Sequence, residues 1–156
     1  PAALGVQVAY PDALVVDISG EASFMMNMQE LSTLAQYNLP VKIFIINNEW
    51  MGMVRQWQEL LHGSRYSESY TDSLPDFIKL AEAFGWTGLV ANDPGELESV
   101  IDHMIQVDGP VIADIRVDQK ENCFPMIPSG AAHNEMLMGP NAAQTAEVSD
   151  AGKALV

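Results

Sequence analysis

Short apolar runs rich in β-branched residues alternate with longer amphipathic stretches along most of this chain. The runs lie at 13–18, 41–46, 86–91 and 110–117, and each is apolar at nearly every position. A strand with one solvent-exposed face would alternate between apolar and polar residues, whereas a strand buried on both faces would not. The pattern therefore predicts strands that are buried on both faces.

Helical periodicity marks the stretches around these runs. Apolar positions at helical spacing predict a helix over 24–37 and another over 53–61, and residues 1–9 read as the end of a helix. A further helix opens at 73–76, runs to Phe84 and stops at Gly85. Asn92-Asp93-Pro94 caps a last helix of about fifteen residues. Residues 19–23, 47–52 and 63–73 are predicted turns or loops.

Strands that alternate with helices indicate an α/β fold, a parallel sheet with helices on both faces. Ligands of such sheets bind outside the carboxyl ends of the strands, where adjacent loops diverge. This rule selects two loops, 20–23 after the first strand and 47–52 after the second. Residues 1–10 have the small apolar texture of a buried helix and no initiator Met, so we expect an N-terminally truncated domain with an exposed apolar edge.

The two selected loops carry oxygen ligands and anion-binding backbone. Gly20 lets a ligand approach the backbone, and Ala22 and Ser23 open a predicted helix whose free N–H groups favour an anion. Glu21 and Asn48 are 27 positions apart, the length of one strand-to-strand crossover, which would place them side by side. Carboxylate, amide and carbonyl oxygens suit Mg²⁺, which binds phosphates in turn. The alternative is an ordinary turn, a solvated acid and an ordinary loop.

The charge of the chain changes this picture in one respect. Lys and Arg total 7 against 21 Asp and Glu, a net charge of −14, which argues against nucleic acid or anionic lipid as main partner. The positive charge that a bound diphosphate needs would then have to come from backbone N–H groups or a metal ion.

No apolar run reaches transmembrane length, and the single cysteine fits a reducing, cytoplasmic compartment. Cys123 is expected to pack as a small hydrophobe, and Arg55 to be a solvated or interface charge.

Several motifs resemble those of one known family. Gly20-Glu21-Ala22-Ser23, followed after a variable stretch by Asn47-Asn48, is similar to the thiamine-diphosphate signature. The segments MQELSTLAQYNLPVKIFIINN, GMVRQWQ, RYSES, PDFIKLAEAFG and FPMIPSG resemble the catalytic large subunit of acetolactate synthase, most specifically GMVRQWQ. The resemblance implies a C-terminal thiamine-diphosphate-binding domain over 1–140, partial at its N-terminal side. Composition without a clear period predicts a flexible tail over 141–156.

The resemblance also implies roles for single residues. Mg²⁺ would be held by the side chains of Glu21 and Asn48 and by the main-chain oxygen of Trp50. Met53 would pack beneath the cofactor, and Trp57 would line the substrate channel. The implied cofactor-binding residues are Gly20, Glu21, Ala22, Ser23, Asn48, Trp50, Met51, Gly52 and Met53. Because Met53 and Trp57 are four positions apart on one predicted helix, packing in a core is the alternative for both.

The implied activity is the condensation of pyruvate with a second 2-keto acid, pyruvate or 2-ketobutyrate, with loss of CO2, in branched-chain amino-acid biosynthesis. The catalytic glutamate and the FAD domain of the family lie outside these residues, so the chain alone should be inactive. The resemblance further implies a bacterial homodimer or larger oligomer, with the cofactor at the subunit interface and a regulatory small subunit as a further partner. The family pattern has Asp where this chain has Glu21, which adds a methylene to a site that tolerates little error. Two alternatives stay open: another thiamine-diphosphate carboligase or decarboxylase, and a degenerate non-catalytic homologue.

Overall fold

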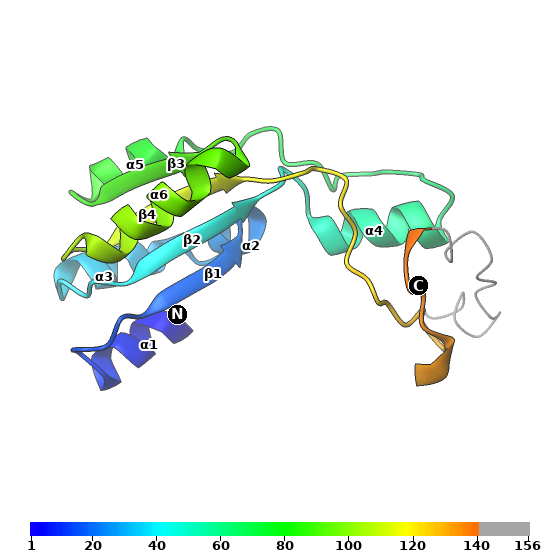
Figure 1. Ribbon diagram of the computed structural model, residues 1–156, viewed down its shortest axis with the longest axis horizontal. Helices are drawn as coiled ribbons and strands as arrows, with labels where there is room; N and C mark the ends of the chain where they lie inside the picture. The colour runs from blue at the N-terminus through cyan, green and yellow to red at the C-terminus, as the bar shows by residue number, and fades with distance from the viewer. Residues whose placement is uncertain (141–156) are drawn as a thin grey trace. The chain divides into compact units, whose positions relative to one another are not determined.

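The computed structural model describes residues 1–140, which form two compact units (Figure 1). The sheet unit comprises Pro1–Glu49 and Thr71–Gln119, and the α4 unit comprises Trp50–Tyr70 and the described residues from Lys120 on. The predicted tail over 141–156 lies outside the described residues, and the assignment of 1–140 as one binding domain stays a prediction. Among residues 1–140, no helix combines the length and apolar content that crossing a bilayer requires.

The sheet unit is built on four parallel strands in the order β1-β2-β4-β3. Their bounds are β1 Val16–Gly20, β2 Lys42–Asn47, β3 Thr87–Ala91 and β4 Val111–Arg116. All four predicted strands are present and the sheet is parallel, as predicted. Ser19 and Gly20 were predicted as part of a turn, and this is wrong. The first strand continues through both residues, because they pair in register with Ile45 and Ile46 of β2.

The helices of the sheet unit lie between the strands in sequence. Their bounds are α1 Ala2–Ala9, α2 Glu21–Met25, the 3₁₀ turn Met28–Glu30, α3 Leu31–Gln36, α5 Phe77–Ala83 and α6 Pro94–Gln106. The prediction of one helix over 24–37 is wrong, since the chain turns at Asn27, with φ −129° and ψ 10°. The Asn27 side chain donates a hydrogen bond to the Ser23 carbonyl at 3.3 Å, an alternative to the helical ladder that asparagine offers readily.

Apolar side chains cover both faces of the sheet, and α6 packs on the face opposite α2, α3 and α5 (Figure 1). Alternate residues of β2 and β4 face opposite layers, because strand side chains alternate. The first layer is formed mainly by Phe24, Leu31, Leu34, Ile43, Ile45, Phe77, Ala81, Trp86 and Ile112. The second is formed by Phe44, Leu89, Ala91, Leu97, Val100, Met104, Val111, Ala113 and Ile115. The predicted cover of helices on both faces is thus confirmed.

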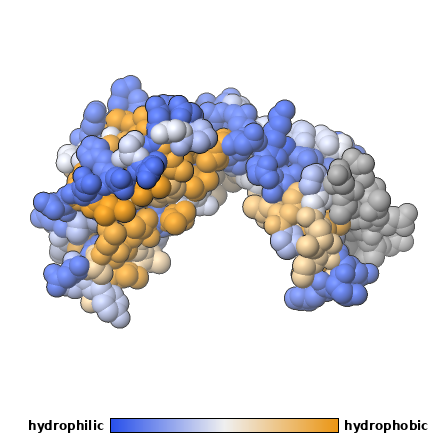
Figure 2. All heavy atoms as spheres, viewed as in Figure 1, coloured by the Kyte–Doolittle hydropathy of each residue, from blue (hydrophilic) through white to orange (hydrophobic). Residues whose placement is uncertain are grey.

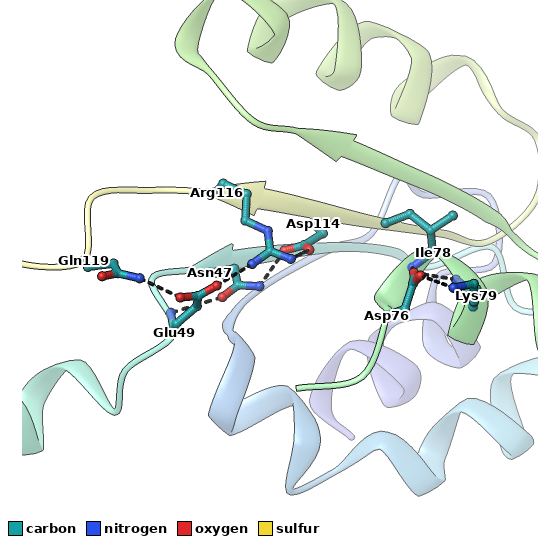
Figure 3. Close-up of polar contacts among 8 residues, drawn as sticks. All are labelled: Asn47, Glu49, Asp76, Ile78, Lys79, Asp114, Arg116 and Gln119. Carbon is teal, nitrogen blue, oxygen red and sulfur yellow. Dashed lines mark hydrogen bonds and ion pairs between the residues drawn. The ribbon is translucent and has the colours of Figure 1, made fainter. Parts of the chain in front are cut away.

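Helix α5 begins at a side-chain cap and lies directly against β3. The Asp76 carboxylate accepts hydrogen bonds from the N–H groups of Ile78 and Lys79, both at 3.1 Å (Figure 3). Gly85 ends the helix with φ +74°, a conformation that glycine adopts at little cost. A Cβ on Gly88 would lie 2.8 Å from the Cα of Ile78, so only glycine lets the helix approach this closely.

Part of the sheet unit is apolar and uncovered. Ile18 of β1 is 71% exposed, Val16 is 40% exposed, and Val8 of α1 is 61% exposed. Val16 and Ile18 pair in register with Lys42 and with Phe44, which packs in the α6 layer, so they face the side of the sheet that α6 covers further along. Apolar atoms gather over this part of the sheet unit in Figure 2. The exposed apolar edge expected from residues 1–10 is present.

The α4 unit is organised by two neighbouring polar residues of helix α4, Gly52–Leu61. Arg55 is 6% exposed, so the expectation of a solvated or interface charge is wrong. Its guanidinium forms an ion pair with Glu59 at 2.7 Å and lies 5.6 Å from the centre of the Trp50 ring and 5.7 Å from that of Tyr66. These contacts satisfy the charge without solvent.

Gln56, the next residue, is 1% exposed and binds the segment after Lys120. Its side-chain amide donates to the Cys123 carbonyl at 3.0 Å and accepts from the Cys123 N–H at 2.7 Å. The expectation that Cys123 packs as a small hydrophobe is wrong, because this residue is exposed. Its backbone, and not its thiol, makes the contact with α4. A 3₁₀ turn over His133–Glu135 follows in the same unit.

Candidate functional site

The two loops selected from the sequence leave adjacent strands side by side. Gly20, the last residue of β1, pairs in register with Ile46, the penultimate residue of β2. Glu21 and Asn48 follow directly, and the Asn48 backbone N–H donates a hydrogen bond to the Glu21 carboxylate. Glu21 and Asn48 thus lie side by side within the sheet unit, as predicted from the crossover.

Glu21 is a buried carboxylate at the start of α2, only 1% exposed. Burial is the largest effect on its pKa and raises it above the usual 4.5, because desolvation disfavours the charged form, and the nearby Asp114 carboxylate adds to the rise. Hydrogen bonds from its own N–H, from Asn48 and from the Thr71 hydroxyl, at 3.4 Å, act in the opposite direction. A positive ion near Glu21 would remove the cost of ionising it.

Asp114 and Asn47 form a second buried polar pair at the same edge of the sheet. Asp114 lies in β4 and is 1% exposed, and its Oδ1 accepts from the Asn47 side-chain amide at 2.9 Å. The Asn47 Oδ1 in turn accepts from the Glu49 N–H at 3.1 Å. No role for Asp114 was predicted from the sequence. A single acid inside the apolar run at 110–117 was the available signal, since buried acids are rare unless they are paired.

Arg116, at the end of β4, connects this pair to the loop after β2. One guanidinium nitrogen lies 3.0 Å from Asp114 Oδ2, and another lies 3.0 Å from Glu49 Oε1. The Gln119 amide donates to Glu49 Oε2 at 2.6 Å. Figure 3 shows these side chains pointing toward one another across the ends of β2 and β4. Neither Arg116 nor Glu49 was predicted from the sequence as part of the site.

The other predicted cofactor residues belong to the α4 unit. Trp50 pairs with Tyr70 in an isolated antiparallel bridge, whose hydrogen bonds come from flanking residues such as Met51, which donates to the Ser69 carbonyl at 2.8 Å. In a bridge of this kind the carbonyl of the paired residue points away from the partner strand. The Trp50 carbonyl therefore does not serve the bridge. Met51 and Gly52 lead directly into α4.

An open apolar groove of about 610 Å³ lies along α4. Met53 and Trp57 line it, and Met53 is 52% exposed. The other lining residues are Val54, Gln58, His62 and Arg65. Packing in a core was the alternative for Met53 and Trp57, and neither is buried in this chain. Both side chains are therefore accessible from the groove.

The donor set of the predicted metal site is a carboxylate, an amide and a main-chain carbonyl. Residues 1–140 contain no cluster of three or more His, Cys, Asp or Glu side chains able to hold a metal. A site with one carboxylate needs no such cluster, because Mg²⁺ usually binds through one or two carboxylates plus phosphates and waters. Glu21 would provide that carboxylate, and a bound cation would offset the burial and the Asp114 charge that disfavour its ionised form. The sheet-unit donors thus fit Mg²⁺ chemically.

Comparison with known proteins identifies the family. Residues 1–115 match the family described as thiamine pyrophosphate enzyme, C-terminal TPP binding domain. The chain belongs to this family. The matched region includes both loops of the candidate site, with Glu21 and Asn48, and also α4.

The similar proteins include acetolactate synthase subunits and a thiamine diphosphate-dependent decarboxylase. The acetolactate synthase large subunit of Pyropia yezoensis is 52% identical over 138 residues, 88% of this chain. The large subunit of acetolactate synthase isozyme 2 from Escherichia coli K12 is 47% identical over 137 residues. The chain spans 23% and 25% of the length of these relatives. A solved thiamine diphosphate-dependent 4-hydroxybenzoylformate decarboxylase of Rhodococcus jostii RHA1 is 29% identical, with a TM-score of 0.69 over 76% of this chain and 22% of its own.

Proposed function

We propose that this chain is the magnesium- and thiamine-diphosphate-binding part of an acetolactate synthase large subunit. The observation that carries the proposal is the contact between the Asn48 N–H and the buried Glu21 carboxylate at the ends of two parallel strands. Identities of 45–52% to acetolactate synthase subunits favour this enzyme over others with the same cofactor.

Three groups would hold Mg²⁺, namely the side chains of Glu21 and Asn48 and the main-chain oxygen of Trp50. The ion offsets the negative charge of the diphosphate in a chain whose own net charge is −14. The backbone of Ala22 and Ser23 would contact the diphosphate oxygens. Glycine leaves room beside the backbone, so Gly20 and Gly52 would let the cofactor approach the chain closely. Met51, which directly precedes Gly52, would contact the cofactor as well.

Thiamine diphosphate, when bound, supplies the nucleophile that takes up the acyl unit of pyruvate with loss of CO2 and passes it to a second 2-keto acid. Met53 would support the cofactor from α4. Trp57, one turn further along the same groove, would contact the acceptor and favour 2-ketobutyrate over pyruvate. The products, 2-acetolactate and 2-aceto-2-hydroxybutyrate, are precursors of branched-chain amino acids.

The remaining parts of the active site would come from outside these residues. By resemblance to the family, the glutamate that activates the cofactor belongs to another domain of a neighbouring subunit, and a middle domain carries FAD. We therefore propose a cytoplasmic homodimer or larger oligomer with the cofactor at the subunit interface and a regulatory small subunit as a further partner. The chain alone should bind the cofactor weakly and produce no acetolactate.

Cofactor binding and product analysis on the intact protein test the proposal. Calorimetric titration with thiamine diphosphate should show binding that requires Mg²⁺ and disappears with EDTA. Incubation with pyruvate plus 2-ketobutyrate should yield 2-aceto-2-hydroxybutyrate in excess over 2-acetolactate, and Trp57→Leu should reduce that excess. Release of free aldehyde without condensation would instead support a decarboxylase, which the similarity to the Rhodococcus jostii enzyme makes the second candidate.

Glu21 in place of the family's Asp provides a further test. An intact protein that binds no thiamine diphosphate, but binds it after Glu21→Asp, would be a degenerate homologue and not a working synthase. Binding by both forms would support the proposed function and would show that the longer side chain is tolerated.

A further inference from the structure

Four side chains form a ring of contacts that passes through the backbone of Asn48, one of the residues that the proposed function assigns to the metal. Asn47 binds Asp114 at 2.9 Å, Asp114 binds Arg116 at 3.0 Å, and Arg116 binds Glu49 at 3.0 Å. The backbone from Asn47 to Glu49 completes the ring, and a hydrogen bond of 3.1 Å between the Glu49 N–H and Asn47 Oδ1 crosses it. Asn48 is the one residue between the two anchored positions, Asn47 and Glu49.

The ring forms where it does because of the register of β2 and β4. Asn47 pairs with Arg116, and Ile45 pairs with Asp114, so the side chains of Asn47, Asp114 and Arg116 lie on one face of the sheet at its carboxyl end. Glu49, two residues beyond β2, joins them through its contact with Arg116. Backbone bonds add to the ring, since the Val117 N–H donates to the Asn47 carbonyl at 3.0 Å and the Thr71 N–H to the Glu49 carbonyl at 2.8 Å. Both neighbours of Asn48 are therefore fixed by side-chain and backbone contacts.

The backbone at Glu49 is itself strained. Its φ is +61°, in the left-handed region that side chains other than glycine rarely adopt. Such a conformation persists only where the surroundings hold it, and it concentrates at ligand-binding sites. Glu49 is held through both carboxylate oxygens, one by Arg116 and the other by the Gln119 amide at 2.6 Å. A glycine at this position would relieve the strain but would lose both contacts.

We infer that Arg116 and Glu49 are positioning residues, which set the Asn48 side chain at the distance from Glu21 that a divalent cation requires. The inference rests on the proposed function. Arg116 suits the role because its planar guanidinium presents separate N–H groups to Asp114 and to Glu49 at once, which one ammonium group cannot do in the same geometry. Partners of this kind, one step removed from the metal, orient ligands and affect metal affinity strongly.

The test measures Mn²⁺ as a probe of the Mg²⁺ site, by electron paramagnetic resonance, in the intact protein with thiamine diphosphate present. Arg116→Ala and Glu49→Gln should each raise the dissociation constant for Mn²⁺ roughly tenfold to hundredfold. Arg116→Lys should give a smaller rise. The double variant should be little worse than the worse single one, because both changes open the same ring. Lys79→Ala, which removes the exposed ion pair with Asp76, is the matched control and should leave the constant unchanged.

Glu49→Gly separates positioning from stability. It should weaken Mn²⁺ binding as Glu49→Gln does, while its melting temperature stays at or above that of Glu49→Gln, because glycine relieves the left-handed strain. Saturating Mn²⁺ should restore thiamine-diphosphate binding in every variant. Wild-type affinity in Arg116→Ala and Glu49→Gln, whatever their melting temperatures, would overturn the inference and leave the proposed function standing. An intact wild-type protein that binds neither Mn²⁺ nor thiamine diphosphate would overturn both.

Discussion

Lys42 and Arg116 lie at opposite ends of the sheet, and the partners of these two cations differ in kind. At the amino end, Lys42 is 3% exposed and its ammonium donates to the carbonyl oxygens of Val107 and Gly109, just beyond α6. At the carboxyl end, the Arg116 side chain is 39% exposed and contacts the carboxylates of Asp114 and Glu49. One cation satisfies neutral main-chain groups, and the other is shared between two acids.

The difference separates stability from function. Lys42 donates to carbonyl groups that follow the last turn of α6, where a positive charge is favourable. These contacts hold the end of α6 against β2. Around Arg116, the charges of Asp114, Glu49 and the nearby Glu21 exceed the single guanidinium. At the amino end the Lys42 ammonium serves main-chain carbonyls, with the Asp108 carboxylate nearby. At the carboxyl end the acids outnumber the one guanidinium, and a divalent cation would offset the excess negative charge. Four predictions test this contrast.

The largest effect is expected for Glu21→Gln. Loss of the one carboxylate in the proposed metal site should weaken Mn²⁺ binding by more than about 100-fold, beyond the range for residues that only orient a ligand. The melting temperature should not fall, because the variant removes a buried charge whose ionisation burial disfavours. Titration with Mn²⁺ and scanning calorimetry of the intact protein measure both. Glu98→Gln, on the exposed side of α6, is the control, and equal loss of affinity there would contradict the assignment.

Lys42→Met should have the opposite profile. It leaves the Val107 and Gly109 carbonyls without their ammonium donor and should lower the free energy of opening of β2 by about 3 kcal/mol. Native-state hydrogen exchange of the β2 amides measures this quantity. The affinity of the remaining folded protein for Mn²⁺ should be unchanged, so a Lys42 variant with weakened metal binding would remove the distinction between the two ends. Lys79→Met, at a side chain that is 80% exposed, serves as the control.

Asp93→Ala tests the N-terminal end of α6, opposite the end that Lys42 contacts. The Asp93 carboxylate accepts from the Gly95 N–H at 2.7 Å and caps the first turn of α6. Loss of the cap should destabilise α6 by about 1 kcal/mol, less than the loss of Lys42, because this site is exposed to water. Hydrogen exchange of the α6 amides measures the effect, and Asp93→Asn should retain most of the stability. A loss as large as that of Lys42→Met would show that both helix ends matter equally.

The smallest expected effect is a pH dependence of the contribution that Lys42 makes to the free energy of unfolding. Burial lowers the pKa of Lys42 below its usual 10.5, and Asp108 opposes this only in part. Between the folded pKa and 10.5 the unfolded chain binds more protons than the folded protein, so folding becomes more favourable as pH rises through that window. The stability difference between wild type and Lys42→Met should therefore widen with rising pH below 10.5. A constant or narrowing difference in urea unfolding would contradict this sign.

Much of the architecture followed from the sequence alone. Largely apolar runs predicted the four strands, and strong local signals such as Asp76, Gly85 and Asp93 predicted helix ends that the structure confirms. The division of residues 24–37 into α2, a 3₁₀ turn and α3 was missed, because apolar spacing does not reveal where the Asn27 side chain competes with the helical ladder.

The site was predictable where it depends on chain order and not where it depends on register. Glu21 and Asn48 each follow a strand, and one crossover separates them, so their juxtaposition follows from local pattern and the handedness of the connection. Asp114 lies 67 positions after Asn47 in the chain. It and Arg116 come to the candidate site only because β4 pairs beside β2. Nothing in the spacing of these residues encodes that pairing.

The sequence by itself therefore determined the parallel sheet, its two candidate loops and the ligand types they offer, because these depend on periodicity and residue chemistry. Only the tertiary structure decided which acids share Arg116, that Arg55 is buried, and that Glu49 takes a left-handed backbone. The physical reason is that burial and ion pairing depend on which distant segments meet, and strand order fixes those meetings after the local elements have formed.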